Sequence, residues 1–168
     1  MPSGARILVT VRCATIATPA GALVLVGDGE VVTRMEFGLP VERTWARDDG
    51  GFADARHQLA AWFAGERREL TFPVAPAGTE FQRRVWDALR AIPYGMTRTY
   101  GEIAAELGTA PRAVGNANGR NPLSIVIPCH RLVGADGGLR GYLGGTGIKR
   151  WLLDHERAVA GIAGAPGD

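Results

Sequence analysis

The chain has 168 residues, a net charge of +2 and a hydrophobic fraction of 46%, enough apolar material for one domain or two small ones packed together. Its two cysteines, Cys13 and Cys129, exclude a disulfide framework and a cysteine-based zinc site, so we expect no metal. The N-terminus lacks a signal-peptide pattern and no window approaches the roughly 20 apolar residues of a membrane span, so we expect no membrane contact and a reducing bacterial cytoplasm.

Residues 7–37 predict a three-stranded antiparallel meander. They are mostly β-branched or apolar, and turn sequences at 18–21 and 27–30 divide them into three short segments. A charged stretch at 40–50 follows. Beyond it, apolar side chains recur at the spacing of one helical face, at Phe52, Ala55, Leu59 and Phe63. We therefore expect one helix after the sheet.

The segment 71–78 marks an expected domain boundary. It carries two prolines and a glycine, which is typical of a linker or an irregular edge strand. We expect an α+β domain at 1–77 and a second domain at 78–168.

The charges are distributed unevenly between these two domains. The first holds 8 basic and 9 acidic side chains, whereas the second holds 11 basic and 8 acidic side chains. Residues 107–135 include three arginines and no acid, a local basic patch that favours a nucleic-acid partner without establishing one.

The second domain opens with two capping boxes, each at the start of an expected helix. Thr79 begins the first helix, and Thr99 begins a short second one that ends at Gly108. Pro111 suits the first position of a third helix, which runs to about Gly119. Two short helices joined by a tight turn predict a helix-turn-helix.

The third of these helices has almost no bulky side chains, since it contains Arg112, Ala113, Gly115, Asn116, Ala117 and Gly119. A glycine inside a helix costs about 1 kcal/mol relative to alanine, so two of them need a reason. Either the helix backbone approaches a large partner such as a DNA groove, or it packs tightly on a neighbouring helix. The sequence leaves both alternatives open.

A short buried strand is expected at 123–128, directly before a turn that carries Cys129. A hairpin turn at 134–138 and a glycine-rich loop at 141–147 follow, and the segment 148–159 predicts a last helix. These elements together predict an α+β fold: a small antiparallel sheet with one helix, then a mostly helical domain.

Cys129 is the candidate nucleophile. Pro128 restrains the backbone before it, and His130 and Arg131 would bring positive charge that favours a thiolate. Neighbours on an extended chain point to opposite faces, so a direct contact between Cys129 and His130 requires a helical turn or a bridging water. His130 would in turn need an orienting acceptor, for which Glu156 in the last helix is a candidate.

Several motifs follow one another between Phe81 and Glu156: Ile92-Pro93-Tyr94-Gly95, Thr99-Tyr100-Gly101-Glu102-Ile103-Ala104, Arg112-Ala113-Val114-Gly115, Asn121-Pro122, Ile127-Pro128-Cys129-His130-Arg131, Gly141-Tyr142 and Trp151-Leu152-Leu153-Asp154-His155-Glu156. In this order they closely resemble the C-terminal domain of methylated-DNA–protein-cysteine methyltransferases, also called 6-O-alkylguanine-DNA alkyltransferases. The first half resembles, more weakly, the family's ribonuclease H-like N-terminal domain, without the zinc ligands that some members carry there.

The resemblance implies direct-reversal DNA repair without a cofactor. Methyl or other alkyl groups would leave 6-O-alkylguanine, and also 4-O-methylthymine, in duplex DNA after base flipping. Cys129 would accept them irreversibly, once per molecule, as a suicide enzyme does. His130 would act through water as the base and Glu156 would orient it. Tyr100 would hydrogen-bond the flipped base, and Asn121 would brace the turn.

The resemblance also implies two sets of contacts. Arg112 would enter the base stack as an arginine finger from the minor groove. The other residues implied to contact DNA are Thr99, Tyr100, Ala113, Gly115, Asn116, Gly119 and Arg120. The residues implied to line the substrate pocket are Ser124, Leu132, Arg140, Tyr142, Leu143 and Gly144. The expected partner is double-stranded DNA containing alkylated guanine, bound by a monomer, with clustering on DNA left open.

This sequence departs from the family pattern at several of these positions. The connection before Arg112 is short and Pro111 replaces a usual alanine, which puts the placement of the finger in question. Arg140 and Leu143 stand where small residues are common, and Ser124 where a proline is frequent in vertebrate members. These changes bear on the range of alkyl groups accepted more than on methyl transfer.

Three other classes of protein compete with this interpretation. An alkyltransferase-like protein, which only flags damaged bases, has another residue at the cysteine position. A helix-turn-helix transcription factor would need long polar side chains on the second helix of the motif. A cysteine hydrolase would turn over repeatedly, which a stoichiometric reaction forbids.

Overall fold

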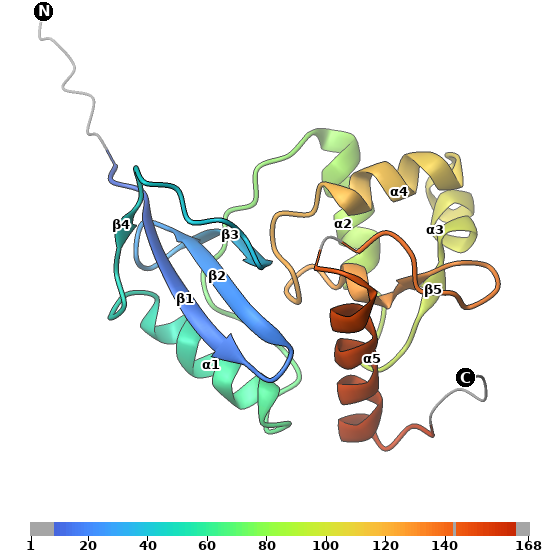
Figure 1. Cartoon of the computed structure of the whole chain (residues 1–168). Helices are drawn as coiled ribbons and strands as arrows, with labels where there is room; N and C mark the ends of the chain where they lie inside the picture. Colours follow the sequence, from blue (N-terminus) through green and yellow to red (C-terminus); the bar gives the residue numbers. More distant parts are fainter. Residues whose placement is uncertain (1–8, 143, 164–168) are drawn as a thin grey trace, which may run out of the picture.

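The computed structural model describes residues 9–142 and 144–163, and Figure 1 shows how they are arranged. The first part contains β1 (Arg12–Thr18), β2 (Gly21–Gly27), β3 (Val32–Phe37), β4 (Ala46–Arg47) and α1 (Ala53–Phe63). The second part contains α2 (Glu80–Arg90), β5 (Arg98–Thr99), α3 (Tyr100–Leu107), α4 (Pro111–Gly119), the 3-10 helix η1 (Cys129–Arg131), β6 (Leu132–Val133) and α5 (Thr146–Ala160). The expected α+β fold is confirmed.

The sheet of the first part has the order β3-β2-β1-β4. Strands β1, β2 and β3 pair antiparallel, which confirms the predicted meander. Strand β4 pairs parallel with β1 over two residues and lies within the charged stretch 40–50, where we expected no strand. Both of its residues are exposed, so no alternation of apolar and polar side chains signals it.

Strand β2 is a continuous apolar run because both faces of the sheet are covered. On one face of the sheet, Leu23 and Leu25 belong to the main hydrophobic core, and α1 covers this face (Figure 1). On the opposite face, Val24 and Val26 pack with Cys13 beneath the partly buried Leu39, Val41 and Trp45. Cys13 is only 2% exposed, which agrees with its interpretation as a core residue in a strand.

Helix α1 packs through a face slightly different from the expected one. Ala55 and Leu59 are buried as predicted, but Trp62 takes the next buried position and Phe63 is only half-buried. Phe52 precedes the helix in the left-handed region, with φ 56°, and is buried. The helix therefore begins after Phe52, one residue later than the apolar period alone would place it.

The edge strand β3 joins the first part of the chain to the second. At the start of β3, Val32 donates its N–H to Pro73 O (3.0 Å) in the segment 71–78, which forms an isolated bridge with the strand. Further along β3, Met35 N–H donates to Pro122 O (2.7 Å) and Ser124 N–H donates to Met35 O (2.8 Å). The sheet thus holds the segment that leads to Cys129.

Both predicted capping boxes are present. Thr79 Oγ1 accepts from Gln82 N–H at the start of α2, and Thr99 Oγ1 accepts from Glu102 N–H at the start of α3. Gly108 ends α3 in the left-handed conformation (φ 65°), and Pro111 occupies the first turn of α4. Helices α3 and α4 therefore form the predicted helix-turn-helix, and the short connection still places Arg112 in the first turn of α4.

The strand predicted at 123–128 is wrong. Only Leu123 forms an isolated bridge, with Met35, and the chain then turns, with Ile125 in the left-handed region at φ 73°. Apolar composition alone did not distinguish a buried strand from a buried irregular turn. The pairing near Cys129 occurs instead between β5 and β6, which run parallel over two residues each and lie far apart in sequence.

Helix α5 contacts both parts of the chain, and Figure 1 shows it between the sheet and the helix-turn-helix. On the side of the first part, His155 Nε2 hydrogen-bonds Trp62 O (2.9 Å), and the His155 ring stacks on Trp151. The buried residues of α5 are Lys149, Leu152, Leu153 and Glu156, of which Lys149 and Glu156 hydrogen-bond residues of the second part. Its inward face therefore brings two charged residues next to η1.

Candidate active site around Cys129

The turn before Cys129 is held by the side chain of Asn121. Asn121 Nδ2 donates to Ile127 O (2.8 Å) and Asn121 Oδ1 accepts from Leu123 N–H (2.8 Å), so one amide bridges both ends of the turn. Between these ends lies Ile125, a β-branched residue at positive φ, which costs about 1–3 kcal/mol. The structure therefore places Asn121 where the resemblance implied, as the brace of a strained turn.

Cys129 begins η1 and its side chain is almost fully buried, at 6% exposure. Burial raises the pKa of its thiol to about 11, although the Asn121 amide, the Lys149 charge and the backbone N–H groups of Cys129 and His130 act in the opposite direction. In this state the thiol is protonated at neutral pH. The expectation that neighbouring cations would favour a thiolate is therefore wrong for the free protein.

His130, Arg131 and Glu156 form a buried network. His130 Nε2 lies 2.7 Å from Glu156 Oε1, and Arg131 donates to Glu156 through Nε (3.0 Å to Oε2) and Nη2 (2.8 Å to Oε1). Arg131 Nη1 also donates to Ile92 O (2.7 Å), and Glu156 Oε2 accepts from Gly95 N–H (3.0 Å). Arg131, which we expected to act on Cys129, is occupied by this carboxylate.

The charges in this network follow from burial and pairing. Burial lowers the pKa of His130 below its ordinary value despite the adjacent carboxylate, so its ring is neutral at neutral pH. Burial would raise the pKa of Glu156, but the contacts with His130 and Arg131 outweigh it and hold that pKa at about 2. At neutral pH the imidazole is neutral and the Arg131 guanidinium is the cation paired with the Glu156 carboxylate, whereas the charge of His130 lowers the Glu156 pKa at acid pH, where the ring is protonated.

The contact with Glu156 fixes the tautomer of His130. A neutral imidazole that donates from Nε2 carries a lone pair on Nδ1. Nδ1 is buried and has no hydrogen-bond partner in the part of the chain that the structure describes. Within the same residues no hydrogen bond joins the imidazole to Cys129. The free nitrogen is thus available as a proton acceptor, and because it makes no hydrogen bond with Cys129, a proton from the thiol would have to reach it indirectly.

Lys149, the only lysine in the chain, is a site residue that the sequence analysis missed. It is fully buried, and Nζ donates to Leu132 O (2.5 Å) and to Arg140 O (2.9 Å). Burial lowers its pKa to about 8, whereas negative charge on Cys129, once that thiol ionises, acts in the opposite direction. A signal existed, because Lys149 shares the helical face of Leu152 and Glu156, where a charge is unexpected.

The pocket at Cys129 is small, about 10 Å³, and is lined by Asn118, Asn121, Ser124, Cys129, Gly141 and Tyr142. Ser124 and Tyr142 were expected there, and Asn118 was not. Tyr100 lies beside it, and its hydroxyl donates to Arg140 O (3.0 Å). Burial, and then the Cys129 charge, raise the pKa of Tyr100, so the phenol is protonated at neutral pH.

The other residues expected in the pocket lie around it. Leu132 is fully buried in β6 and contributes its carbonyl to Lys149. The Arg140 side chain points away and pairs with Asp136 (2.6 Å), so it does not narrow the pocket. Gly144 lies against the Tyr142 ring and Phe37, and Leu143 lies outside the described residues.

Five of the eight residues expected to contact DNA line an open groove of about 680 Å³ beside α4. Its lining includes Ala113, Gly115, Asn116, Gly119 and Arg120 from the expected set, together with Thr79, Phe81, Gln82 and Ala117. Arg112 is exposed on the first turn of α4. Thr99 caps α3 and is half-buried, so its hydroxyl already has a partner within the protein.

The two glycines of α4 are not explained by packing within the chain. A Cβ at Gly119 would meet nothing within 4 Å among the described residues, and one at Gly115 would only touch the Tyr100 ring at 3.8 Å. Alanine would therefore fit at both positions and form a more stable helix. The alternative of tight packing on a neighbouring helix is wrong, and close approach of an external partner remains.

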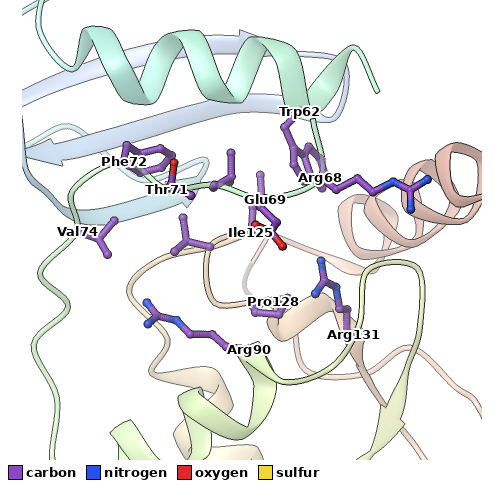
Figure 2. A pocket seen from close by; sticks show the side chains of 12 residues that line it. Trp62, Arg68, Glu69, Thr71, Phe72, Val74, Arg90, Ile125, Pro128 and Arg131 are labelled. Atoms are coloured by element: carbon purple, nitrogen blue, oxygen red, sulfur yellow. The ribbon is translucent and has the colours of Figure 1, made fainter. Parts of the chain in front are cut away.

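A cavity of about 360 Å³ lies on another side of the turn that precedes Cys129 (Figure 2). Trp62, Phe72 and Val74 line it from the first part of the chain and the segment 71–78, whereas Ile125 and Pro128 line it from the turn. It shares no lining residue with the pocket at Cys129. Because this cavity borders Ile125 and Pro128, the turn before Cys129 depends on its hydrogen bonds with β3 and with the Asn121 side chain.

Comparison with known proteins identifies the class. The chain matches two family models, the ribonuclease-like domain of 6-O-methylguanine DNA methyltransferase over residues 11–76 and the DNA-binding domain of the same family over residues 80–158. The chain belongs to the 6-O-methylguanine DNA methyltransferase family, and it carries that family's DNA-binding domain.

Individual relatives are similar over almost the whole chain. The methylated-DNA–protein-cysteine methyltransferase of Mycobacterium leprae is 47% identical, over 88% of this chain and 93% of that protein. The crystal structure of Mycobacterium tuberculosis O6-methylguanine methyltransferase is 47% identical with a TM-score of 0.82, covering 95% of this chain and 97% of that one. A structure of the M. tuberculosis protein in complex with DNA is 49% identical, with the same TM-score, over 88% and 94%.

Among the described residues, no helix combines the length and apolarity needed to cross a membrane.

Proposed function

We propose that this protein repairs DNA by direct reversal, moving one alkyl group from 6-O-alkylguanine in duplex DNA to its own Cys129. The observation that carries the proposal is the arrangement beside this thiol. His130 has one nitrogen held by the buried Glu156 carboxylate and the other free, and Asn118 of the helix-turn-helix lines the pocket that contains Cys129. This is the nucleophile, base and orienting group that thiol chemistry requires.

The proposed reaction begins when the thiol proton passes through a water molecule to His130 Nδ1. The sulfur of Cys129 then attacks the alkyl carbon, the carbon–oxygen bond breaks, and its electron pair remains on the purine. Tyr100, whose phenol is protonated at neutral pH, supplies the proton that the leaving base needs, and the proton held by His130 then returns through water to the Tyr100 phenolate. Glu156 stabilises the imidazolium while it exists.

The product explains why the reaction happens once. A thioether at a saturated carbon has no carbonyl for water to attack, in contrast to an acyl-enzyme, so the thiol is not regenerated. A soft sulfur nucleophile suits attack on an alkyl carbon, and neither step needs a metal or cofactor. The protein is therefore a suicide enzyme with a single turnover.

DNA is proposed to bind along α4 through the minor groove. This groove is about 6 Å wide, so a helix that enters it needs small side chains. The unfilled space around Gly119 supports this mode, because a missing side chain there serves no contact within the chain. Arg112 would fill the gap left by the flipped base. The chemistry would reside in residues 78–168, with 1–77 supporting the catalytic turn.

The target base must enter a pocket too small for it in this structure. A purine does not fit in about 10 Å³, so Gly141 and Tyr142 must move when the base enters. Tyr100 must also exchange the Arg140 carbonyl for the base. The proposed targets are 6-O-alkylguanine and, less readily, 4-O-methylthymine, in a bacterial cytoplasm, bound by a monomer.

Stoichiometric mass gain tests this function. When the protein is mixed with a duplex containing 6-O-methylguanine, one methyl mass should appear on the peptide that contains Cys129, once per molecule. Mass spectrometry of the digested protein measures both the site and the stoichiometry. Repeated turnover, or DNA binding without any mass gain, would contradict the proposal.

Arg112→Ala should slow repair in duplex DNA by roughly 10- to 100-fold, because the extruded base then leaves an unfilled gap and flipping costs a few kcal/mol. Reaction with the free alkylated base, which needs no flipping, should be almost unchanged. Single-turnover rate constants on both substrates provide the comparison. Arg150→Ala, an exposed arginine on α5, is the matched control. An equal loss on both substrates would count against the finger role.

A further inference from the structure

Asn118 stands out as a polar residue on the buried face of α4. It shares this face with Val114 and Ala117, and its side chain is only 4% exposed. An asparagine buried among apolar neighbours lowers the stability of the folded state unless its amide is hydrogen-bonded, so we expect a hydrogen-bond partner for Asn118. Asn118 also lines the pocket that contains Cys129.

The two asparagines of this pocket differ in their hydrogen bonds. Asn121 uses both ends of its amide within the protein, to Ile127 O and from Leu123 N–H. Asn118 Oδ1 is buried and has no partner among the described residues. The pocket therefore contains an unused hydrogen-bond acceptor, and a ligand that satisfies it must bring a donor.

The chemistry of the substrate restricts which donor this can be. In 6-O-alkylguanine the alkyl group removes the proton from N1, and N9 is bonded to the sugar. The only N–H donors left on the base are those of the 2-amino group. In 4-O-methylthymine the ring nitrogen that faces the same edge is an acceptor, and the base has no N–H donor at all.

We propose that Asn118 is a specificity-determining residue whose Oδ1 accepts a hydrogen bond from the 2-amino group of the flipped purine. The inference rests on the proposed function and adds to it the chemical group by which the site selects its base. A site built around an acceptor rejects an analogue without the donor, because the acceptor then stays buried and unpaired. Asn118 thus favours alkylated guanine over alkylated thymine.

The experiment compares two duplexes that differ by one amino group, with 6-O-methylguanine or 6-O-methylhypoxanthine at the same position. Single-turnover rate constants for methyl uptake are measured on both. The wild-type protein should react roughly tenfold more slowly without the amino group, the effect of one unpaired buried acceptor. Asn118→Leu should lower the rate on 6-O-methylguanine and bring the ratio of the two rates close to one.

Two further variants separate recognition from folding and from DNA binding. Asn118→Asp keeps an acceptor oxygen, so the ratio should persist even though the added charge lowers both rates. Asn116→Leu, an exposed asparagine on the same helix, should change both rates together and leave the ratio as in the wild type.

A ratio unaffected by Asn118→Leu, or lost in Asn118→Asp, overturns the role of Asn118 while methyl transfer itself stands. A wild-type protein that takes no methyl group from 6-O-methylguanine overturns the proposed function as well, so the two failures are distinguishable.

Discussion

A Cys129→Ala variant is expected to bind duplex DNA and to accept no methyl group. The reason is chemical, since the proposed product is a thioether and alanine offers no atom that can form it. The DNA contacts proposed for α4 lie on a different element from η1, so binding should persist. The fold should also persist, because replacing a small buried thiol removes only one atom from a core that Asn121 continues to brace.

Cys13 provides the matched control for this variant. It is the only other cysteine, it is also buried, and it lies in the separate cluster that includes Trp45. Cys13→Ala should accept one methyl group on Cys129 at the wild-type rate, as measured by intact-protein mass spectrometry. Methyl uptake by Cys129→Ala, or its loss in Cys13→Ala alone, would place the acceptor elsewhere.

Glu156→Gln should destabilise the protein by about 3–5 kcal/mol, because it leaves the buried Arg131 guanidinium without a counter-charge. The same change removes the carboxylate that orients His130, so methyl transfer should slow roughly 10- to 100-fold, as when an orienting group is lost elsewhere. Urea unfolding and single-turnover kinetics measure the two effects. Both the loss of stability and the slower transfer are expected because the Glu156 carboxylate contacts Arg131 and His130 at once.

The acid stability of the protein should depend on the same residue. The Glu156 pKa is about 2 in the folded protein, against 4.5 ordinarily, so its contribution is complete above about pH 4.5 and is lost as the pH falls toward 2. The loss amounts to about 3 kcal/mol. The lowered pKa of His130 acts in the same direction from about pH 6.5 downward, because only the unfolded chain then binds the proton.

Glu106→Gln is the control for the acid-stability measurement. Glu106 pairs with Arg98 at the surface and is half exposed, so its removal should change the unfolding free energy by less than about 1 kcal/mol. Below about pH 4.5, the unfolding free energy should fall less steeply with decreasing pH for Glu156→Gln than for the wild type or Glu106→Gln. A parallel pH dependence in all three would show that the network does not control acid stability.

The elements that the sequence predicted well are those specified by local signals. The capping boxes at Thr79 and Thr99 and the glycine at 108 determine helix ends through contacts three or four residues apart, and all three are present. The turns of the meander are equally local. Strand β4 and the β5–β6 pair were missed, because each is two residues long and depends on a partner distant in the chain.

The error at 123–128 has the same origin. The apolar run indicates burial but not backbone conformation, and it is Asn121, with its two hydrogen bonds across the turn, that selects an irregular path with Ile125 at positive φ. The charge on the thiol was also misjudged. Adjacency of Arg131 in sequence suggested an effect on Cys129, but the guanidinium turns toward Glu156, 25 residues away.

By itself, the sequence determined the family, because the order of motifs around Cys129, His130 and Glu156 is specific to it, and the chemical roles of these three residues follow from it as predictions. Only the tertiary structure decided their state: a protonated thiol, a neutral imidazole with one nitrogen free, and an ionised carboxylate. It also revealed Lys149 and Asn118, which belong to no motif beside Cys129. The reason is physical, since burial and pairing set protonation and unused hydrogen bonds, and both arise only when α4, α5 and η1 pack together.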